Sequence, residues 1–390
     1  MYAIQTSNKI AACGLDRLPR DTYETATEIA NPAGILVRSQ EMKDLELPAS
    51  VLGIARAGAG VNNIPLDKCT TKGIVVFNTP GANANGVKEL VIAALMLSSR
   101  KIFEGMVFTQ TLKGKDDADK IVEKEKGRFV GPEIEGKTMG VIGLGAIGVM
   151  VANATAALGM KVLGYDPFIS VEAAWKLSTS VQKAASLEKL IAESDYITIH
   201  VPFMAETKGL FNAARIALMK KGARLMNFSR SGLVDNQAVI AAVKAGQLGA
   251  YVTDFPEEEL LGIDGVLCIP HLGASTPESE DNCAIMAVDQ LREYLERGNI
   301  KNSVNFPNCE MAPSGKTRIC VANKNVPNVI SSLTGILGTS GLNIDDMINK
   351  NRGDVAYNII DVSGNVPADL AGKINAVDGV IITRIIPTCV

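Results

Sequence analysis

The segment Gly143-Leu144-Gly145-Ala146-Ile147-Gly148 constrains the fold of this chain more than any other. An apolar stretch typical of a strand, residues 139–142, precedes it, and a stretch typical of a helix, residues 147–158, follows it. In a dinucleotide site the first glycine makes a tight turn, the second lets the backbone approach a pyrophosphate, and the third lets the helix pack on the strand. The helix N-terminus then offers free N–H groups to the phosphates. A plain glycine-rich turn is the alternative, but these flanking elements favour a Rossmann nucleotide unit.

The cofactor is indicated by the end of the next strand, residues 161–165, which Asp166 follows. The distance of Asp166 from the glycine motif along the sequence is typical of a carboxylate that hydrogen-bonds the adenosine ribose. The negative charge would repel a 2′-phosphate, and Pro167 and Phe168 offer no arginine to receive one. The sequence therefore predicts NAD rather than NADP. Asp-Pro is also a common turn pair, and the dipeptide alone would favour that interpretation.

Composition excludes several classes of protein. The 390 residues suggest two or three domains, and 47% hydrophobic residues with a net charge of −3 are typical of a globular protein with an ample core. No basic patch suits a nucleic acid, and no apolar stretch approaches the length of a membrane span. The chain start lacks the apolar core of a signal peptide, and the 7 scattered cysteines form no disulfide or zinc pattern. We therefore expect a cytoplasmic protein without a metal site.

The glycine motif begins far from the chain start, so another unit precedes it. Short strands are predicted at residues 34–37, 51–55 and 74–78, followed by an apolar helix over 86–103 and a polar stretch over 112–136. A second long helix starts at Thr276-Pro277, an N-cap followed by proline, and runs to about Arg297. This order indicates that the chain leaves a first domain, builds the nucleotide domain and returns. We assign residues 1–98 and 274–305 to the first, split domain and residues 99–273 to the second.

The end of the chain has a pattern of its own. Residues 298–315 are rich in Asn, Pro, Ser and Gly, and we assign residues 306–315 to a linker. Residues 316–390 predict strand, helix, strand, strand, helix and strand, the βαββαβ order of a ferredoxin-like fold. Because this tail holds no histidine and no acidic cluster, we expect a regulatory or oligomerising role. The predicted fold is α/β throughout: a split flavodoxin-like domain, an inserted Rossmann domain and a ferredoxin-like tail.

Polar residues follow four predicted strands of the nucleotide domain. Because ligands of parallel sheets bind beyond the carboxyl ends of the strands, these residues are candidates for the site. They are His200, Ser229, Arg230, Asp254, Glu257, Glu258, Glu259 and His271.

This set suits hydride transfer from an alcohol to NAD, which requires a base for the hydroxyl proton. The ordinary pKa of histidine, about 6.5, suits that task. Both histidines of the chain lie at strand ends, and neither spacing nor composition separates them. A nearby glutamate would orient the imidazole, and Arg230 would bind a substrate carboxylate. Each residue alone is equally well explained as a surface or half-buried group, but their joint placement favours the site.

A further candidate is the loop of residues 55–63, where a predicted strand ends in a glycine-rich turn with Arg56. Its backbone N–H groups and the guanidinium are suited to an oxyanion. A plain turn with an exposed arginine is an equal alternative on these residues alone.

Together these segments resemble the D-2-hydroxyacid dehydrogenase family over almost the whole chain. The resemblance rests on the glycine motif, on residues 56–63, 78–80 and 200–202, and above all on Asn-Phe-Ser-Arg-Ser-Gly at 227–232 and Pro-His-Leu-Gly-Ala-Ser-Thr at 270–276. The tail resembles an ACT domain, a small ligand-sensing fold.

The resemblance implies a role for each matched residue. His271 becomes the acid/base and Arg230 the group that binds the substrate carboxylate and carbonyl. The carboxylate partner of His271 is Glu259 if the family's aspartate is aligned on Asp254, which we prefer, or Glu258 if its phenylalanine is aligned on Phe255. The residues implied to contact NAD are Gly143, Gly145, Ala146, Ile147, Gly148, Asp166, His200, Val201, Pro202, Thr207, Ser229, Asp254, Gly273 and Ala274. Those implied to hold substrate are Arg56, Ala57, Gly58, Ala59, Gly60 and Asn83.

This sequence departs from the family pattern at a few positions. Ser231 replaces a usual glycine, and Lys88 replaces a frequent alanine, which suggests a cation that assists a substrate phosphate. In the tail, Asn323 and Asn328 replace the histidine and glycine of the usual serine-binding pattern, whereas Asn325 and Asn343 match it. We therefore do not expect serine feedback, although the fold is retained.

The activity that the resemblance implies is the NAD-dependent oxidation of 3-phospho-D-glycerate to 3-phosphohydroxypyruvate, the first step of L-serine biosynthesis. The implied partners are a small phosphorylated 2-hydroxy acid and further copies of the chain, in a homodimer or homotetramer. One alternative is a dehydrogenase of another D-2-hydroxy acid, such as 2-hydroxyglutarate. A more distant one is an NADH-sensing protein like the corepressors that resemble this family.

Overall fold

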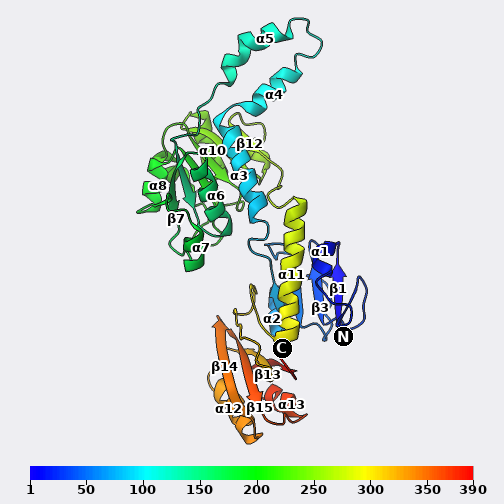
Figure 1. The fold of residues 1–390 in the computed structure, drawn as a ribbon. Coiled ribbons are helices and arrows are strands. Elements are labelled where there is room, and N and C mark those ends of the chain that lie inside the picture. The colour runs from blue at the N-terminus through cyan, green and yellow to red at the C-terminus, as the bar shows by residue number, and fades with distance from the viewer. Residues whose placement is uncertain (390) are drawn as a thin grey trace. The chain divides into compact units, whose positions relative to one another are not determined.

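A computed structural model describes residues 1–389, which fold as two units (Figure 1). The first unit joins residues 1–82 to residues 280–389, and the second is Asn83–Ser279. The chain therefore leaves one α/β unit, builds another and returns.

The first unit is built on a five-stranded parallel sheet in the order β2-β1-β3-β4-β5. Its central strands are short apolar runs buried on both faces, as parallel strands between helices require. Helix α11 crosses this unit, and the side chain of Leu291 packs where Gly34 and Gly53 leave room. The elements are β1 (Tyr2–Ser7), α1 (Ala12–Leu15), β2 (Tyr23–Ala26), β3 (Gly34–Val37), β4 (Gly53–Arg56), α2 (Leu66–Thr71), β5 (Val75–Phe77) and α11 (Pro277–Arg297).

The second unit holds a seven-stranded parallel sheet in the order β12-β11-β10-β9-β6-β7-β8. The chain starts at β6, adds β7 and β8 on one side, and then returns to place β9 on the other side of β6. This reversal creates the switch point at which Rossmann folds bind dinucleotides. The strands are β6 (Thr138–Ile142), β7 (Lys161–Tyr165), β8 (Gln182–Lys183), β9 (Tyr196–Ile199), β10 (Ala223–Asn227), β11 (Leu248–Thr253) and β12 (Val266–Cys268), and the helices are α3 (Ala84–Ser99), α6 (Ala146–Ala157), α7 (Val171–Lys176), α8 (Leu187–Glu193), α9 (Ala213–Leu218), α10 (Asn236–Lys244) and the 3-10 turn η2 (Glu258–Leu260).

The predicted helix over residues 86–103 is two helices. It breaks at Arg100, whose backbone is extended (φ −124°, ψ 137°), and α4 (Ile102–Gln110) then leads into α5 (Ala118–Glu125) and the 3-10 turn η1 (Lys126–Phe129). We call residues 102–129 the helical arm, which Figure 1 shows extending away from the sheet of the second unit. Its first helix buries no side chain and leaves Phe103 and Met106 56% and 62% exposed. Such apolar exposure marks an interaction surface.

The C-terminal module has the predicted βαββαβ order, and its four antiparallel strands lie in the order β14-β15-β13-β16. This is the ferredoxin-like arrangement. Its elements are β13 (Thr317–Lys324), α12 (Val329–Thr339), β14 (Asn343–Arg352), β15 (Val355–Ser363), α13 (Leu370–Asn375) and β16 (Val380–Ile386).

One face of this module shares a hydrophobic core with the end of α11. Tyr294 of the helix packs in the same buried cluster as Cys320 and Tyr357 of the module. The connecting segment contributes to this core as well: in residues 306–315, which we assigned to a linker, Phe306, Cys309 and Met311 are buried. The module is therefore fused to the first unit by continuous packing.

Candidate active site

The glycine motif forms the turn between β6 and α6. Gly143 has φ 87°, a conformation that glycine adopts without strain, and a side chain there would clash with the carbonyl of His200. A side chain at Gly148 would clash with the carbonyl of Gly143, so this glycine lets the helix pack closely. Gly145 is exposed, and nothing lies within 4 Å of the position its Cβ would take. The loop therefore leaves open space at the glycine that a pyrophosphate would approach.

Asp166 lies at the end of β7 beside this loop. Its carboxylate accepts hydrogen bonds from the backbone N–H groups of Leu144 and Phe168, both at 2.8 Å. The side chain thus shapes the glycine loop and the turn that follows β7. This position of Asp166 fits both interpretations made from the sequence, an acceptor for the ribose hydroxyls and a turn residue.

Asp254 follows β11 and is only 1% exposed. Its Oδ1 atom has no hydrogen-bond partner in the described chain. Burial raises the pKa of Asp254, while the nearby charges of His271 and Arg230 act in the opposite direction. The strand ends thus bring Asp254, Arg230 and His271 into one electrostatic group, with a buried acceptor oxygen available.

The structure separates the two histidines that the sequence left equivalent. His200 bonds Thr198 Oγ1 through Nε2 at 3.0 Å, its Nδ1 is buried without a partner, and burial lowers its pKa to about 3. His271 instead lies exposed at the sheet edge, with its ring beside that of Phe255. His200 is therefore held neutral at physiological pH, and His271 is the histidine accessible to a ligand.

The three glutamates after β11 have different surroundings. Glu259 accepts a hydrogen bond from Gln237, and Glu257 accepts one from Ser231 at 2.7 Å. Glu258 makes no side-chain hydrogen bond or ion pair within residues 1–389. No hydrogen bond joins any of the three to His271 in that range, so the structure brings them near the edge without choosing a partner for the imidazole.

Asn227 is a residue whose role the sequence did not single out. It is the last residue of β10 and is 2% exposed. Its side chain donates to the carbonyl of Arg230 at 2.9 Å and accepts from the N–H of Ser229 at 3.2 Å. Ser229 in turn donates to the carbonyl of Ile199 at 2.7 Å. These bonds fix the turn that presents Arg230. The signal in the sequence that could have revealed this role is an asparagine at the end of an apolar strand.

Two further predicted segments border this edge in the second unit. Thr207 Oγ1 donates to the carbonyl of Pro202 at 2.7 Å and closes the loop that follows His200. Gly273 is buried, and a side chain there would meet Val87 of α3, with a Cβ 3.1 Å from Val87 Cγ2. Asn83 directly precedes that helix. Lys88, on the same helix, lies 3.6 Å from Glu89, a weak ion pair that leaves its charge available.

The predicted substrate loop lies in the first unit at the carboxyl end of β4. Arg56 donates through Nε to the carbonyl of Arg38 at 2.9 Å and through Nη1 to the carbonyl of Gly60. Asn78 donates to the carbonyl of Ala59 at 2.6 Å. The guanidinium therefore folds back on its own loop and fixes the shape of residues 56–60.

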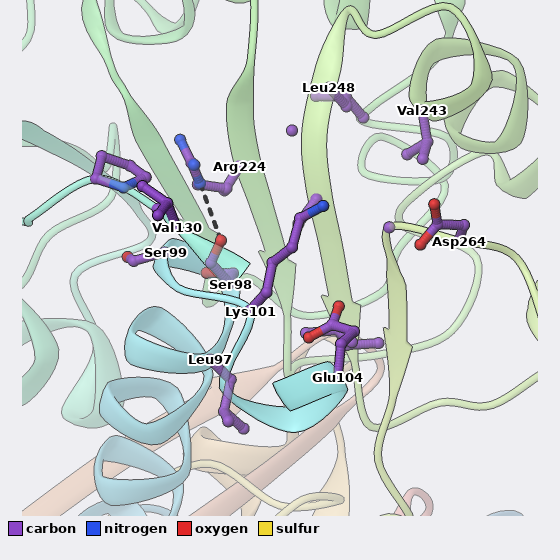
Figure 2. Close-up of a pocket in the computed structure, with 16 residues that line it drawn as sticks. Leu97, Ser98, Ser99, Lys101, Glu104, Val130, Arg224, Val243, Leu248 and Asp264 are labelled. Atoms are coloured by element: carbon purple, nitrogen blue, oxygen red, sulfur yellow. Dashed lines mark hydrogen bonds between the residues drawn. The ribbon is translucent and has the colours of Figure 1, made fainter. Parts of the chain in front are cut away.

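A separate pocket of about 220 Å³ lies at the opposite, amino-terminal edge of the second sheet (Figure 2). Figure 2 shows Arg224 of β10 bonded to the carbonyl of Ser98, with Lys101 from just before the helical arm and Glu104 from its first helix. This pocket contains none of the predicted site residues. Among the described residues there is also no cluster of three or more His, Cys, Asp or Glu suited to a metal ion, and no helix long and apolar enough to cross a membrane.

These features define a protein in which a Rossmann-type unit is inserted into a second parallel α/β unit. Residues 92–273 match the D-isomer specific 2-hydroxyacid dehydrogenase family in its NAD binding domain. D-3-phosphoglycerate dehydrogenase of Archaeoglobus fulgidus is 37% identical over 300 residues, 74% of this chain and 54% of that protein. D-3-phosphoglycerate dehydrogenase 1 of Saccharomyces cerevisiae is 31% identical over 340 residues, 80% of this chain and 68% of that protein. The chain belongs to the D-isomer specific 2-hydroxyacid dehydrogenase family.

Solved structures show the same architecture. The NAD⁺-bound 3-phosphoglycerate dehydrogenase of Entamoeba histolytica is 25% identical with a TM-score of 0.59, and the match covers 78% of this chain and 98% of that one. The D-mandelate dehydrogenase of Rhodotorula graminis, at 22% identity and a TM-score of 0.66 over 80% and 99% of the two chains, shares the fold. The chain spans about half the length of several curated relatives that it matches, at 54%, 45% and 49%.

Proposed function

We propose that this chain oxidises 3-phospho-D-glycerate to 3-phosphohydroxypyruvate with NAD⁺, the reaction that opens L-serine biosynthesis. The observation that carries the proposal is the grouping of Arg230, Asp254 and His271 at the carboxyl ends of neighbouring strands of a Rossmann sheet. Relatives with the name of this enzyme, at 37% and 38% identity, support the substrate.

The residues of the second unit fit NAD. Gly145 leaves open space for a pyrophosphate above the N-terminus of α6, and Ala146, Ile147 and Gly148 begin that helix. Asp166 would receive the ribose hydroxyls, and the unpaired Oδ1 of Asp254 would accept a carboxamide N–H. His200, Val201, Pro202, Thr207, Ser229, Gly273 and Ala274 complete the proposed wall. When bound, the nicotinamide supplies the hydride acceptor.

In the proposed mechanism His271 accepts the C2 hydroxyl proton through its imidazole, and Arg230 binds the substrate carboxylate and the developing carbonyl oxygen. A carboxylate beside His271 would hold its orientation. We propose Glu259 for that role, from the alignment on Asp254. Glu258 is the alternative, because its side chain has no competing bond among residues 1–389, whereas Glu259 accepts one from Gln237. Glu257→Gln, Glu258→Gln and Glu259→Gln variants separate the candidates, since only the true partner alters the pH profile of kcat.

The loop of residues 56–60 and the start of α3 would hold the rest of the substrate. The shape of residues 56–60 is fixed by Arg56 and Asn78, which leaves their remaining backbone N–H groups to meet an oxyanion. Asn83 directly precedes α3, and Lys88 lies near the start of that helix. We propose that the ammonium of Lys88 assists the phosphate. Lys88→Ala would then raise KM for the phosphorylated substrate more than for an unphosphorylated one.

We further propose a homodimer or homotetramer in the cytoplasm. The exposed apolar side chains of the helical arm, Phe103 and Met106 among them, would be covered by a second copy of the chain. The cysteines of residues 1–389 are all unpaired, which suits a reducing compartment.

The substrate assignment is tested by NADH formation with four acids: 3-phospho-D-glycerate, D-glycerate, D-lactate and D-2-hydroxyglutarate. The proposal requires the highest kcat/KM for the phosphorylated acid. Turnover of 2-hydroxyglutarate alone would retain the mechanism and overturn the serine-pathway assignment. NADH binding without turnover of any acid would point to the NADH-sensing alternative.

A further inference from the structure

Another pocket lies in the first unit, and none of the proposed catalytic residues lines it. It is a pocket of about 490 Å³ lined by the end of β14, by the segment after α11 and by residues that follow β5. A volume of this size is typical of pockets that hold small molecules. In Figure 1 the end of β14 lies beside the loop that follows α11.

The pocket is positively charged. Ile348, Lys350 and Arg352 occupy every second position of β14, so their side chains project from the same face of the strand, the one that packs on α11. Ile348 joins the shared core, whereas the two cations reach the pocket beyond its edge. Neither cation forms an ion pair within residues 1–389, and none of the lining residues there is acidic. Within that range the side chain of Arg352 donates one hydrogen bond, through Nη1 to the carbonyl of Ser303 at 2.7 Å.

The remaining wall is rich in uncharged polar groups. Asn302 and Asn308 come from the segment after α11, and Asn351 lies between the two cations on β14. Amides donate hydrogen bonds to oxygen acceptors, and a lysine with an arginine fork supplies charge and geometry for a carboxylate or phosphate. We propose that this pocket binds a small organic anion through Lys350 and Arg352.

The pocket is connected to the substrate loop by a chain of hydrogen bonds. Asn302 donates to Oε1 of Gln290 at 2.6 Å, and the buried Gln290 donates to the carbonyl of Asn78 at 2.9 Å. Asn78 then donates to the carbonyl of Ala59 at 2.6 Å. An anion that repositions Asn302 therefore shifts the loop of residues 56–60. An effect of the anion on substrate binding rests on the proposed function of that loop, whereas anion binding itself does not.

Binding is tested by calorimetric titration of the full chain with inorganic phosphate and, separately, with succinate. The Arg230→Gln background removes the arginine that we propose for the substrate carboxylate. We expect at least a tenfold weaker Kd in Lys350→Gln and in the Lys350→Gln/Arg352→Gln double variant, and an unchanged Kd in Lys324→Gln, a cation of β13 outside the pocket. The tighter of the two anions identifies the ligand as a phosphate ester or a dicarboxylate. Equal affinity in all variants would mean an adventitious ion only, and no binding of either anion would also overturn the proposal.

The connection to the substrate loop has a separate test. Hydrogen exchange of residues 57–63 should slow when the anion binds. Asn302→Gly keeps the left-handed backbone of this residue (φ 55°) but removes its amide, so the anion should still bind through Lys350 and Arg352, with a weaker Kd, while the change in exchange at saturating anion is lost. Gln290→Met should give the same result. Persistence of the change in both variants, or its absence in the unmodified chain, would contradict the connection.

Discussion

The ring of Phe255 lies against the imidazole of His271, with centroids 4.9 Å apart and planes tilted by 57°. Phe255 directly follows the buried Asp254, so one turn after β11 places both a carboxylate and an aromatic contact near the histidine. Such a contact contributes about 0.5–1.5 kcal/mol beyond area burial.

Replacing Phe255 by alanine should therefore loosen the imidazole. We expect kcat to fall roughly threefold to tenfold with little change in KM, as judged from steady-state NADH formation, because this contact stabilises an orientation rather than substrate binding. Phe255→Tyr retains the ring and serves as the control. A rise in KM at constant kcat in Phe255→Ala would show that the ring acts on substrate binding instead.

The glycines of the nucleotide loop should respond differently to alanine. A Cβ at Gly145 meets open space, whereas one at Gly148 meets the carbonyl of Gly143. We expect Gly145→Ala to keep its melting temperature and to bind NADH at least tenfold more weakly in a fluorescence titration. Gly148→Ala should lower the melting temperature by several degrees, because overpacking costs roughly 1–3 kcal/mol of the free energy of unfolding. Unchanged NADH affinity in Gly145→Ala would contradict the proposed pyrophosphate position.

His200 should make stability depend on pH. Its pKa is about 3 in the folded chain, lowered by burial from the ordinary 6.5. Between these values the unfolded chain binds a proton that the folded chain does not, so the free energy of unfolding falls as pH decreases from 6.5 towards 3. Allowing for partial exposure of the ring, the loss is on the order of 2 kcal/mol at about pH 4.

Urea unfolding of His200→Gln at several pH values checks this expectation. Glutamine retains a group that can bond Thr198 but does not titrate, so its stability should decline less than that of the unmodified chain between about pH 6.5 and 4. Parallel pH curves for the two proteins would show that His200 is not the group responsible.

The C-terminal module should depend on the buried Arg318 for its attachment. Arg318 binds Asp361 through two bonds of 2.7 and 2.9 Å, and it also donates to the carbonyls of Arg297, Met311 and Ala312. Arg318→Ala should destabilise the chain by about 3–5 kcal/mol in urea unfolding, because a buried carboxylate and three carbonyls lose their donor. Lys373→Ala, an exposed pair partner on α13, should cost less than about 1 kcal/mol. Similar losses in both variants would contradict this role for Arg318.

Much of the fold was predictable because local patterns agree with tertiary packing. The motif at Gly143, the strand that ends at Asp166 and the capped helix that begins after Thr276 all have strong local signals, and the structure confirms each element. The helix expected over 86–103 was wrong in its extent. Its apolar period continues past Ser99, but the chain turns at Arg100 and the apolar residues beyond it stay exposed.

The site was predictable in composition but not in its contacts. The rule for parallel strand ends located His200, Arg230, Asp254 and His271 on one edge, yet only burial distinguishes the neutral His200 from the exposed His271. The bond of Gln237 to Glu259 joins residues from two elements, so no local pattern reveals it. The same holds for the packing of the C-terminal module on α11, which depends on long-range contacts.

The most direct test of the proposed function compares the unmodified chain with His271→Asn in NADH formation from 3-phospho-D-glycerate and NAD⁺. Asparagine keeps a polar side chain of similar size but cannot accept the hydroxyl proton. We expect kcat to fall by roughly 10²–10⁴-fold while the Kd for NADH stays the same. Equal kcat in the two proteins would show that His271 is not the base and would contradict the proposed mechanism.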